Sequence, residues 1–582
     1  MADRIFVAVA WPYANGPLHL GHIAGSLLPP DIVARYHRMQ GRDVLMVSGS
    51  DMHGTPITVK AEKEGVSPRE LATRYNQEHM EALRQLHIQF DLFTSTLTEN
   101  HRDVVHDVFL TLHRNGYIYK ATMTAPFDPQ ARRFLPDRYV EGECPHCHFA
   151  DARGDQCDNC GRTLDPQELL KPRSKLTGAT PEYRETEHFF LKLSALEDRL
   201  KKWVAEQAPK AQWRPSTVNF TENWLREGLK DRPITRDITW GVSIPLEGYD
   251  DKRIYVWFEA VIGYLSAAIE WAKRSGNPDG WASFWKDPAT RGYYFLGKDN
   301  IPFHTIIWPA MIMAYREGKG EHFNLPYDVP ANEFMQFQGA KFSKSRGNLI
   351  EVADVVPRFH ADAVRYYLTA NMPETKDANW AWDEFVAKVN DELVGAYGNY
   401  VHRVLTFTRK HYQEVPPAGV LTPRDEMLLK RIAEAHTAAT AHLEAVELKK
   451  AMKEAFALAM EGNKYWDESA PWKLAKENPE RLKTVLHMGL RLARSLAILT
   501  APFLPVSAQN LWNQLGYGGS VHKQKWSEAL GDIPTGQALG EPHILFQKLD
   551  EKEVLAQFLP QETKPTKETK PVTQQPPTAP AA

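Results

Sequence analysis

The segment around His19 and His22 combines residue types that bind phosphate. An apolar run at residues 5–10 and a turn at Asn15-Gly16-Pro17 precede the two histidines, and a helical pattern follows them. Their three-residue spacing places both imidazoles on one face of a first helical turn. Unpaired N–H groups and the helix dipole favour an anion there. Gly21 leaves the backbone open to a flat ligand.

A second segment with phosphate-binding character lies far downstream, at Lys341-Phe342-Ser343-Lys344-Ser345. Gly339 and Gly347 flank it, which predicts a mobile basic loop able to close on polyphosphate. Taken singly, each segment has an ordinary alternative: a pair of surface or metal-binding histidines, or a solvated loop. Their occurrence in one chain, in this order, favours polyphosphate chemistry instead.

The chain has four cysteines, and all of them fall within seventeen residues as Cys144-x-x-Cys147 and Cys157-x-x-Cys160. Two such turns supply the four thiolates of a tetrahedral structural zinc site. A pair of disulfides is the alternative, and it is disfavoured in a chain that lacks a secretion signal. His146 and His148 are competing ligands, although four thiolates complete the coordination sphere without them. We therefore expect one structural Zn²⁺.

Strands and helices alternate in the first part of the chain, which predicts an α/β fold with a parallel sheet. Apolar strands are expected at residues 5–10 and 44–48, with a helix after Gly21 that kinks or restarts near Asp31 because of Pro29-Pro30. Asp51 follows the second strand and should share the carboxyl edge of the sheet with the two histidines. Residues 254–258 and 293–296 are expected to resume this fold after an insertion.

The rest of the chain is expected to contain an insertion and a helical region, which differ in composition and in hydrophobic periodicity. The insertion reads as short strands and turns, and helical periodicity begins near residue 386, at 385–404, 424–443, 448–465 and 481–499, which predicts an α-helical bundle. The expected domains are a Rossmann-like half at 1–117, a zinc-binding connective insertion at 118–240, the second Rossmann half at 241–325, a region with the Lys-Phe-Ser-Lys-Ser loop and stem contacts at 326–385, the helical bundle at 386–540, a segment packing back on the core at 541–560, and a disordered tail at 561–582.

Composition fits a large enzyme of several domains. The 582 residues are 43% hydrophobic, enough for a sizeable core, and the net charge of −3 requires any nucleic-acid contact to use local patches. The apolar runs are shorter than a membrane span, and the N-terminus has no charged-then-apolar leader, so we expect a cytoplasmic protein with no membrane contact. The sequence ends without an appended dimerisation or nucleic-acid-binding domain, which predicts a monomer.

The two phosphate-binding segments resemble the two signature sequences of class I aminoacyl-tRNA synthetases. Pro12-Tyr13-Ala14-Asn15-Gly16, ahead of His-Leu-Gly-His, is similar to the methionyl family of this class. The resemblance runs from about residue 5 to residue 550, and further stretches carry it at 134–144, 256–264, 297–304 and 308–310. The short zinc-bearing insertion also fits this family, which lacks the large editing domain of the isoleucyl, leucyl and valyl relatives.

The resemblance implies that the chain activates L-methionine with ATP and transfers it to the 3′ end of tRNA(Met). The methionine carboxylate attacks the α-phosphorus, and fixed positive charge stabilises the developing negative charge, with Mg²⁺ on the pyrophosphate. The residues matched to catalysis are His19, His22, Lys341 and Lys344, and those matched to ATP binding are these four with Gly21 and Ser343. Lys298 is a further candidate for phosphate contact.

A methionine pocket is the second implication of the resemblance. The matching residues are Trp11, Tyr13, Asp51, Trp257, Ala260, Tyr264, His304 and Trp308, with Asp51 accepting the substrate ammonium group. A polarisable thioether packs well against such aromatic edges. Trp11 stands where many relatives carry a smaller residue, and Val261 stands where proline is common. Ordinary core packing is the alternative for these aromatics.

The helical bundle is expected to read the anticodon. Asn399 and Arg403 lie four apart on one helical face, and Trp472 follows on a later element; all three match anticodon-reading positions of the family. Splayed bases are recognised by stacking and by hydrogen bonds to their edges. The alternative is a satisfied polar pair with a core tryptophan, and spacing alone does not separate the two interpretations.

Two rival functions remain at the level of sequence. A cysteinyl-tRNA synthetase also carries zinc, but in the amino-acid pocket, whereas all four cysteines here lie in the insertion. A non-catalytic nucleic-acid-binding module built on a zinc knuckle leaves both signature segments unexplained. Amino-acid-dependent exchange of pyrophosphate into ATP separates the three possibilities.

Overall fold

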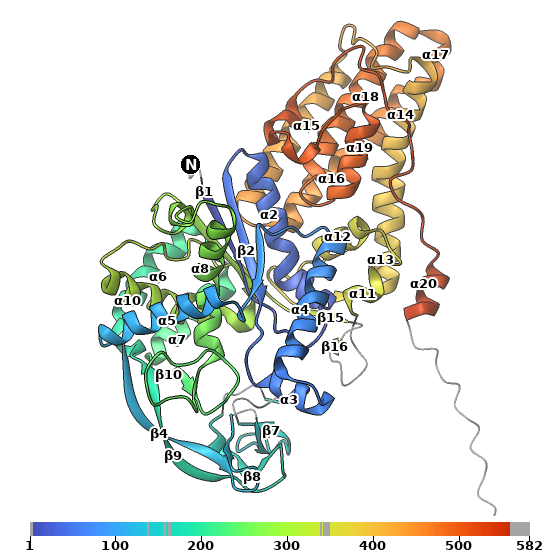
Figure 1. Cartoon of the computed structure of the whole chain (residues 1–582). Coiled ribbons are helices and arrows are strands. Elements are labelled where there is room, and N and C mark those ends of the chain that lie inside the picture. The colour runs from blue at the N-terminus through green and yellow to red at the C-terminus, as the bar shows by residue number, and fades with distance from the viewer. Residues whose placement is uncertain are drawn as a thin grey trace, which may run out of the picture.

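The computed structural model describes residues 4–136, 139–154, 157, 159–160, 164–337 and 350–558, together with the backbone of residues 340–341. Figure 1 shows a mixed α/β body that carries a ribbon-like insertion at one end and an elongated helical region at the other. The predicted α/β class with a helical C-terminal region is therefore confirmed. The predicted tail at 561–582 lies outside the described residues.

A five-stranded sheet organises the α/β body. Its strand order is β14-β13-β1-β2-β3, and every neighbouring pair is parallel. The bounds are β1 Arg4–Val9, β2 Asp43–Ser50, β3 Leu92–Ser95, β13 Arg291–Gly297 and β14 Ala331–Asn332. The strand order reverses between β1 and β13, and ligands of such sheets bind outside the carboxyl ends of the strands at that reversal. The segments that follow β1, β2 and β13 therefore frame the expected site.

Both faces of the sheet are covered because β1 is apolar on both sides. Ile5, Val7 and Val9 pack into one core cluster together with helix α2, and Phe6 and Ala8 pack into a second cluster on the opposite face. The helices around the sheet are α2 Leu28–Met39, α3 Thr55–Glu64, α4 Pro68–Gln85, α5 Glu99–Arg114, α8 Val256–Arg274, α9 Ala282–Trp285 and α10 Trp308–Lys319. The expected strand at residues 293–296 is part of β13, but residues 254–258 give mainly the first turn of α8.

One continuous helical segment leads away from the carboxyl end of β1. It comprises α1 Leu20–His22, a π-helical turn Ile23–Leu27 and α2. The predicted restart falls at Leu28 because Pro29-Pro30 occupy the first turn of α2, where missing N–H groups cost no hydrogen bond. The side-chain amide of Asn332 donates to the carbonyl of Ala24 at 3.0 Å and so satisfies a backbone acceptor in the π turn.

The insertion is built on a long antiparallel ribbon rather than on short strands. β4 Ile118–Asp128 and β9 Glu182–Leu191 pair along their whole length, from Ile118 opposite Leu191 to Phe127 opposite Glu182. Strands β5 Arg133–Phe134 and β10 Arg232–Pro233 extend this sheet, and β6 Val140–Glu143, β7 Ala152–Arg153 and β8 Leu170–Ser174 form a smaller sheet near its tip (Figure 1). Helices α6 Glu197–Ala211 and α7 Pro215–Glu227 lead back to the body, where β11 Thr235–Arg236 pairs with β12 Arg253–Ile254.

A small sheet and short helices connect the body to the helical region. They are β15 Met335–Phe337, β16 Ala340–Lys341 and β17 Ala378–Trp380, with α11 Val352–Val355, α12 Ala361–Ala370 and α13 Trp382–Lys388. The helical region contains α14 Asn399–His411, α15 Pro423–Glu444, α16 Leu448–Ser469, α17 Pro471–Glu477, α18 Pro479–Thr500 and α19 Pro505–Gln514. Helix α20 Glu551–Phe558 returns to α13, where Phe558 stacks on Trp382 with ring centroids 4.0 Å apart.

Buried polar contacts fix helix α2 against the helical region. The guanidinium of Arg365 is fully buried and donates to Asp31 Oδ2 at 2.7 Å and to the carbonyl oxygens of Pro502 and Phe503. At the far end of α2, the hydroxyl of Tyr36 donates to Glu444 Oε1 at 2.9 Å. Because α2 continues from the turn that carries His19 and His22, these contacts also set the position of that turn.

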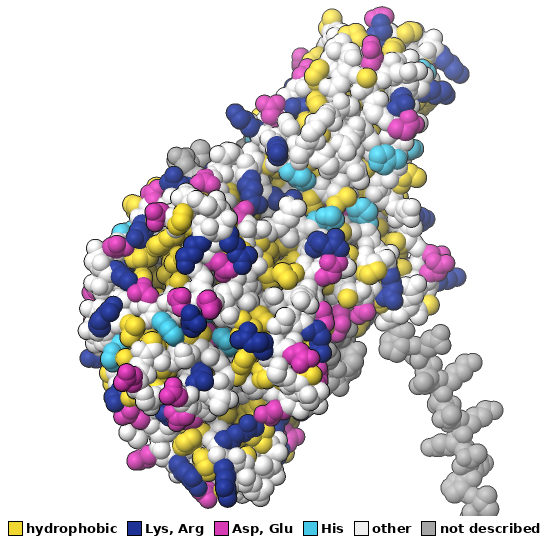
Figure 2. All heavy atoms as spheres, viewed as in Figure 1, with side chains coloured by type: hydrophobic (Ala, Val, Ile, Leu, Met, Phe, Trp, Pro, Cys, Tyr) yellow, Lys and Arg dark blue, Asp and Glu magenta, His cyan; other side chains and the backbone are white. Residues whose placement is uncertain are grey.

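The surface is mixed in charge. Figure 2 shows Lys and Arg side chains interspersed with Asp and Glu over one face, in keeping with a net charge of −3. Among the described residues, we find no helix long and apolar enough to cross a bilayer.

Candidate active site

The two signature histidines form a stacked pair at the start of the helical segment. His19 precedes α1 in extended conformation, His22 lies in its first turn, and their ring centroids are 3.6 Å apart. The backbone N–H of His19 donates to Nδ1 of His22 at 3.3 Å, a long hydrogen bond that leaves Nε2 of a neutral His22 to carry the ring hydrogen. The sequence predicted that both imidazoles share one face, and the structure confirms it.

Both imidazoles are neutral at pH 7 in this structure. Burial lowers the pKa of His19 to about 4. Burial, together with the charges of His19 and His79, lowers the pKa of His22 well below its usual range. Each ring therefore offers one N–H donor rather than a fixed positive charge. Nearby phosphate oxygens would favour protonation, so the pair can gain charge as negative charge develops.

The second signature segment is described only at its beginning. Lys341 lies on β16, where its backbone pairs with Gln336 of β15, and its side chain is outside the described residues. Ser343 and Lys344 also lie outside them. After residue 349 the chain runs beside the first histidine, since Leu20 N–H donates to the carbonyl of Ile350 at 3.1 Å. The described chain therefore resumes at Ile350 next to the histidine turn.

Lys298 follows β13 at the same edge, but its ammonium group already has two carboxylate partners. Its Nζ lies 2.7 Å from Glu333 Oε2 and 2.9 Å from Asp377 Oδ1. These partners outweigh partial burial and raise the pKa of Lys298. Because its charge is compensated, we do not include Lys298 among the phosphate-binding groups.

Aromatic side chains from three segments meet beside this edge. Trp257, in the first turn of α8, stacks on Phe303 with centroids 4.5 Å apart, and Tyr13 contacts Trp257 edge to face at 5.8 Å. Ala260 lies one turn on from Trp257, and both are partly exposed. Trp257 and Phe303 also line a neighbouring cavity of about 450 Å³, bounded by the insertion.

Tyr264 and His304 form a buried polar pair behind these aromatics. Nδ1 of His304 faces the carbonyl of Asn300 at 2.9 Å and must therefore carry the hydrogen, which leaves Nε2 to accept from the hydroxyl of Tyr264 at 2.6 Å. Burial lowers the pKa of His304 to about 4, so this tautomer is neutral. The polar atoms of the pair are therefore satisfied by each other and by the carbonyl of Asn300.

Trp11 fits into the body because two glycines make room for it. A Cβ on Gly49 or on Gly263 would lie 2.7 or 2.8 Å from the Trp11 ring, too close for either position to carry a side chain. Trp308 is fully buried at the start of α10 and packs edge to face against Trp285, with centroids 6.0 Å apart. Trp308 therefore lies in the core behind His304 rather than on an open surface.

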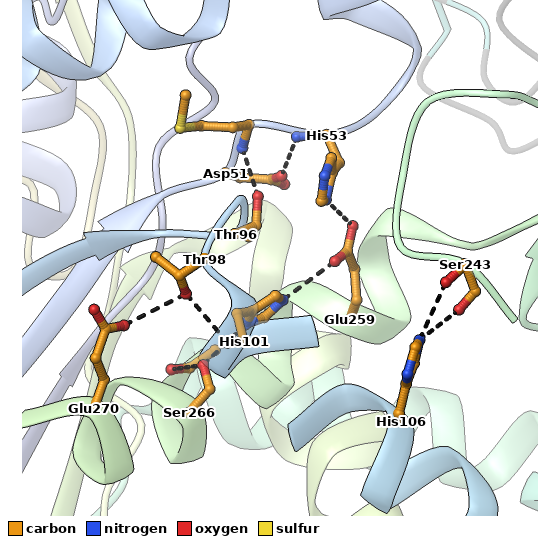
Figure 3. A network of polar contacts seen from close by, with 12 residues as sticks. Asp51, His53, Thr96, Thr98, His101, His106, Ser243, Glu259, Ser266 and Glu270 are labelled. Atoms are coloured by element: carbon orange, nitrogen blue, oxygen red, sulfur yellow. Dashed lines mark hydrogen bonds and ion pairs between the residues drawn. The ribbon is translucent and has the colours of Figure 1, made fainter. Parts of the chain in front are cut away.

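Asp51 lies directly after β2 and only 3% of it is exposed. Its backbone pairs with the segment of Tyr13, since Ala14 N–H donates to the carbonyl of Asp51 at 2.8 Å, and its Oδ1 accepts the N–H of His53 at 3.2 Å. Figure 3 shows that a fully buried carboxylate, Glu259, lies close by between His53 and His101. The sequence analysis assigned no role to these three residues, because they come from separate segments and only the fold brings them together.

The four cysteines converge at the tip of the insertion. Their sulfur atoms all lie within 4.8 Å of one another, with Cys144 Sγ 3.9 Å from Cys160 Sγ and Cys147 Sγ 3.6 Å from Cys157 Sγ. Sulfurs bound at about 2.3 Å to one tetrahedral zinc would lie about 3.8 Å apart. The same distances exclude disulfide bonds. His148 turns instead to Glu143 at 2.9 Å, so the four thiols fit a zinc ion without a histidine.

Replacing Cys157 with serine should remove the metal and loosen the insertion. Cys157 is buried within the core cluster of the insertion, so loss of the metal also disturbs that packing. Metal analysis is expected to give one zinc per wild-type chain and well under one per variant chain. Pyrophosphate exchange should fall only modestly, since the ligands are remote in sequence from the histidine turn. Two zinc ions per chain, or none in carefully purified wild type, would contradict the single structural site.

The three predicted anticodon residues lie in the helical region. Asn399 is exposed at the start of α14, and Arg403, one turn on, forms an ion pair with Asp467 at 2.7 Å. Trp472 is 44% exposed at the start of α17, which excludes the alternative of a fully buried core tryptophan. Both Asn399 and Trp472 thus present side chains to solvent.

Two models of known protein families match almost the whole chain. A family model described as tRNA synthetases class I (M) matches residues 5–405, and one described as the anticodon binding domain of methionyl tRNA ligase matches residues 415–559.

Relatives of known identity carry the same description. The chain is 49% identical over 583 residues to the methionine–tRNA ligase of Roseiflexus castenholzii, and the match covers 95% of this chain and 97% of the relative. It is 51% identical over 555 residues to the methionine–tRNA ligase of Dehalococcoides mccartyi, and that match covers 95% of this chain and 98% of the relative. Among solved structures, Mycobacterium tuberculosis methionyl-tRNA synthetase in complex with methionyl-adenylate superposes with a TM-score of 0.77 at 25% identity, covering 93% of this chain and 99% of that chain.

Proposed function

Because the chain belongs to the methionyl-tRNA synthetase family of class I aminoacyl-tRNA synthetases, we propose that the site described above activates methionine with ATP and passes it to tRNA(Met). The reaction of the family is methionine–tRNA ligation, and the assignment of roles to residues is our proposal. One observation carries it. A single edge of the parallel sheet holds the stacked histidines, the buried Asp51 and the aromatic pocket side by side.

The histidine pair is assigned to the phosphates of ATP. Neutral N–H donors at a helix start bind phosphate oxygens, and they interact more strongly as charge builds on the α-phosphate and the departing pyrophosphate. Gly21 is assigned to the close approach of the nucleotide to the backbone. Lys341, Ser343 and Lys344 are assigned to the same phosphates. Mg²⁺ is expected to enter with ATP, as part of the substrate, and to neutralise pyrophosphate charge.

Methionine is assigned to the aromatic pocket with its ammonium group on Asp51. The thioether packs against Tyr13, Trp257 and Ala260, with Tyr264 and His304 closing the far end. Trp11 and Trp308 complete the predicted set, Trp11 beside the pocket and Trp308 behind it. Because the polar atoms of Tyr264 and His304 are already paired, this end of the pocket favours an apolar side chain without hydrogen-bonding groups, since a polar competitor would have to leave a partner unsatisfied.

The remaining parts serve tRNA and stability. The four cysteines are assigned to one structural Zn²⁺, because four thiolates fill the coordination sphere and leave no open position for catalysis. Asn399, Arg403 and Trp472 are assigned to the anticodon. The boundaries given for the catalytic halves, the insertion, the bundle and the C-terminal segment are likewise our proposals. The monomeric state and the cytoplasmic location stay predictions.

Exchange of labelled pyrophosphate into ATP, run with each amino acid in turn, tests the proposal. We expect exchange with methionine alone. Changing Asp51 to asparagine should lower kcat/KM for methionine by about 10- to 100-fold, since a hydrogen bond between opposite charges contributes about 1.5–3 kcal/mol. The KM for ATP should stay near wild type. If cysteine supported exchange instead, or if Asp51→Asn raised the KM for ATP alone, the assignment would be wrong.

A further inference from the structure

The turn that precedes the two signature histidines is held by side chains of α3 and α4. His79 of α4 is 0% exposed, and its Nε2 donates to the carbonyl of Gly16 at 2.9 Å. Lys60 of α3 is half-buried and donates to the preceding carbonyl, that of Asn15, at 2.7 Å. Two consecutive backbone acceptors of the turn therefore depend on side chains from other helices. A shift of the turn would break both hydrogen bonds and leave polar groups unsatisfied.

The tautomer of His79 is determined by its two partners. The carbonyl of Gly16 can only accept, so Nε2 carries the ring hydrogen, and Nδ1 accepts from the hydroxyl of Ser50 at 2.9 Å. Burial lowers the pKa of His79, although the hydrogen bond to Gly16 opposes this effect. The ring is therefore neutral at pH 7 and has no nitrogen left for a ligand. This arrangement indicates that His79 holds other parts of the protein in place.

The same helices also pack beside Asp51. A small core joins α3 and α4 to the segments on either side of the site, and its buried members are Ala14, Met52, Ile57, Ala61, Leu71, Ala72 and Tyr75. Ala14 directly precedes the held turn, and Met52 directly follows Asp51. The backbone joins the two segments as well, since Asp51 N–H donates to the carbonyl of Pro12 at 2.9 Å. Helix α4 is therefore fixed relative to Asp51, and His79 connects it to the turn.

Little chain separates the held carbonyl from the histidines. Only Pro17 and Leu18 lie between Gly16 and His19, and the ring of Pro17 fixes its own φ angle. Leu18 is buried, and its carbonyl accepts the N–H of Val352 at 3.0 Å. The connection is thus short and held on both sides. A displacement of Gly16 would therefore also displace His19.

We propose that His79 is a positioning residue for methionine activation, which holds the Gly16 carbonyl and so keeps the stacked histidines at the correct distance from Asp51. The inference rests on the proposed function, in which the histidines bind the phosphates of ATP and Asp51 binds the ammonium group of methionine. The methionine carboxylate must reach the α-phosphorus, so the relative position of these groups determines whether the reacting atoms meet. His79 acts through the backbone of the turn rather than on either substrate.

Two amide substitutions distinguish the N–H at Nε2 from the rest of the ring. The amide nitrogen of glutamine lies two bonds beyond Cγ, as Nε2 does, whereas that of asparagine lies one bond beyond Cγ, as Nδ1 does. His79→Gln can therefore still donate to Gly16, and His79→Asn cannot. In His79→Asn we expect kcat of methionine-dependent pyrophosphate exchange to fall about 100-fold, the cost of a misplacement of about 1 Å. In His79→Gln it should stay within about tenfold of wild type, since only one neutral hydrogen bond is lost.

Methionine binding distinguishes a positioning role from a general loss of structure. Equilibrium dialysis with labelled methionine should give the wild-type dissociation constant and the wild-type number of sites in both variants, because Asp51 and the aromatic pocket stay in place. In a His22→Ala background, His79→Asn should cost much less than it does in wild type, since one of the donors that it positions is already lost. A general structural role would instead lower the number of methionine sites.

His106→Asn is the matched control, because Nε2 of His106 on α5 also donates to a backbone carbonyl at 2.9 Å, that of Ser243, outside the signature turn. It should leave exchange unchanged. If His79→Asn does not fold, His79→Met takes its place, since methionine fills the space without a donor.

Three results would overturn the proposal: wild-type kcat in the folded variant that lacks the donor, an equal loss in His79→Gln, or losses that simply multiply with that of His22→Ala. Absence of methionine-dependent exchange in wild type would instead reject the proposed function. Normal exchange in wild type together with any of the three results rejects only the role of His79.

Discussion

Replacing His22 with alanine is expected to lower kcat of methionine-dependent pyrophosphate exchange on the order of 100- to 1,000-fold, the usual effect of removing one donor aimed at developing charge. The imidazole is neutral and already fixed, because its Nδ1 accepts the N–H of His19 and its ring stacks on His19. Its N–H is therefore already oriented for the proposed phosphate contact before ATP binds. Binding of methionine should stay near wild type, since methionine is assigned to the aromatic pocket rather than to the histidine turn.

The control is His436→Ala, which removes another histidine with a lowered pKa, on α15 of the helical region. It should leave exchange unchanged. Because His19 and His22 stack, we also expect the double alanine variant to lose less than the product of the two single losses. A His22→Ala enzyme that lost methionine affinity as steeply as turnover would remove His22 from the phosphate site.

The histidine turn could be predicted because its geometry is local. Two residues three apart at a helix start must share a face, and a helix that follows an apolar strand must begin at the carboxyl edge of a parallel sheet. Asp51 could be placed for the same reason, since it directly follows the neighbouring strand. The zinc site could be predicted because each Cys-x-x-Cys spacing forms a tight turn that presents two thiols to one metal ion. In each case the sequence spacing fixes the spatial relation.

The polar network behind Asp51 could not be predicted in this way. His53, His101 and Glu259 are brought together by the packing of α5 and α8 against β2, and nothing in the sequence near any of them specifies a partner. The two carboxylates that hold Lys298 are likewise supplied by later segments, Glu333 and Asp377. Residues 254–258 form a short apolar run, and such runs fit a strand or a buried helix equally well until their neighbours are known.

The ion pair of Arg403 allows an experiment that distinguishes base recognition from a structural role. Arg403 is held by Asp467 at 2.7 Å, and an exposed pair of this kind contributes little to stability. If Arg403 binds a base, Arg403→Ala should weaken tRNA charging while Asp467→Asn leaves it unchanged or improved, since the arginine is then free to bind the base. If the ion pair itself were what mattered, the two variants would behave alike.

Trp472→Ala should strongly impair tRNA charging and leave methionine-dependent pyrophosphate exchange near wild type. The indole is 44% exposed at the start of α17, in a region separate from the sheet edge to which we assign ATP and methionine. Loss of one base-stacking partner costs on the order of 1–3 kcal/mol, which corresponds to about a 5- to 150-fold fall in kcat/KM for tRNA. Exchange needs no tRNA and should not register the change.

Thermal unfolding of the Trp472→Ala variant must first match wild type, because the half of the indole that is not exposed also packs against its neighbours. Ile544→Ala, at an apolar side chain that is 67% exposed in the C-terminal segment, controls for loss of surface area and should charge tRNA normally. A folded Trp472→Ala protein that lost exchange and charging equally would place Trp472 outside the anticodon site, since only a tRNA contact spares the first reaction while slowing the second.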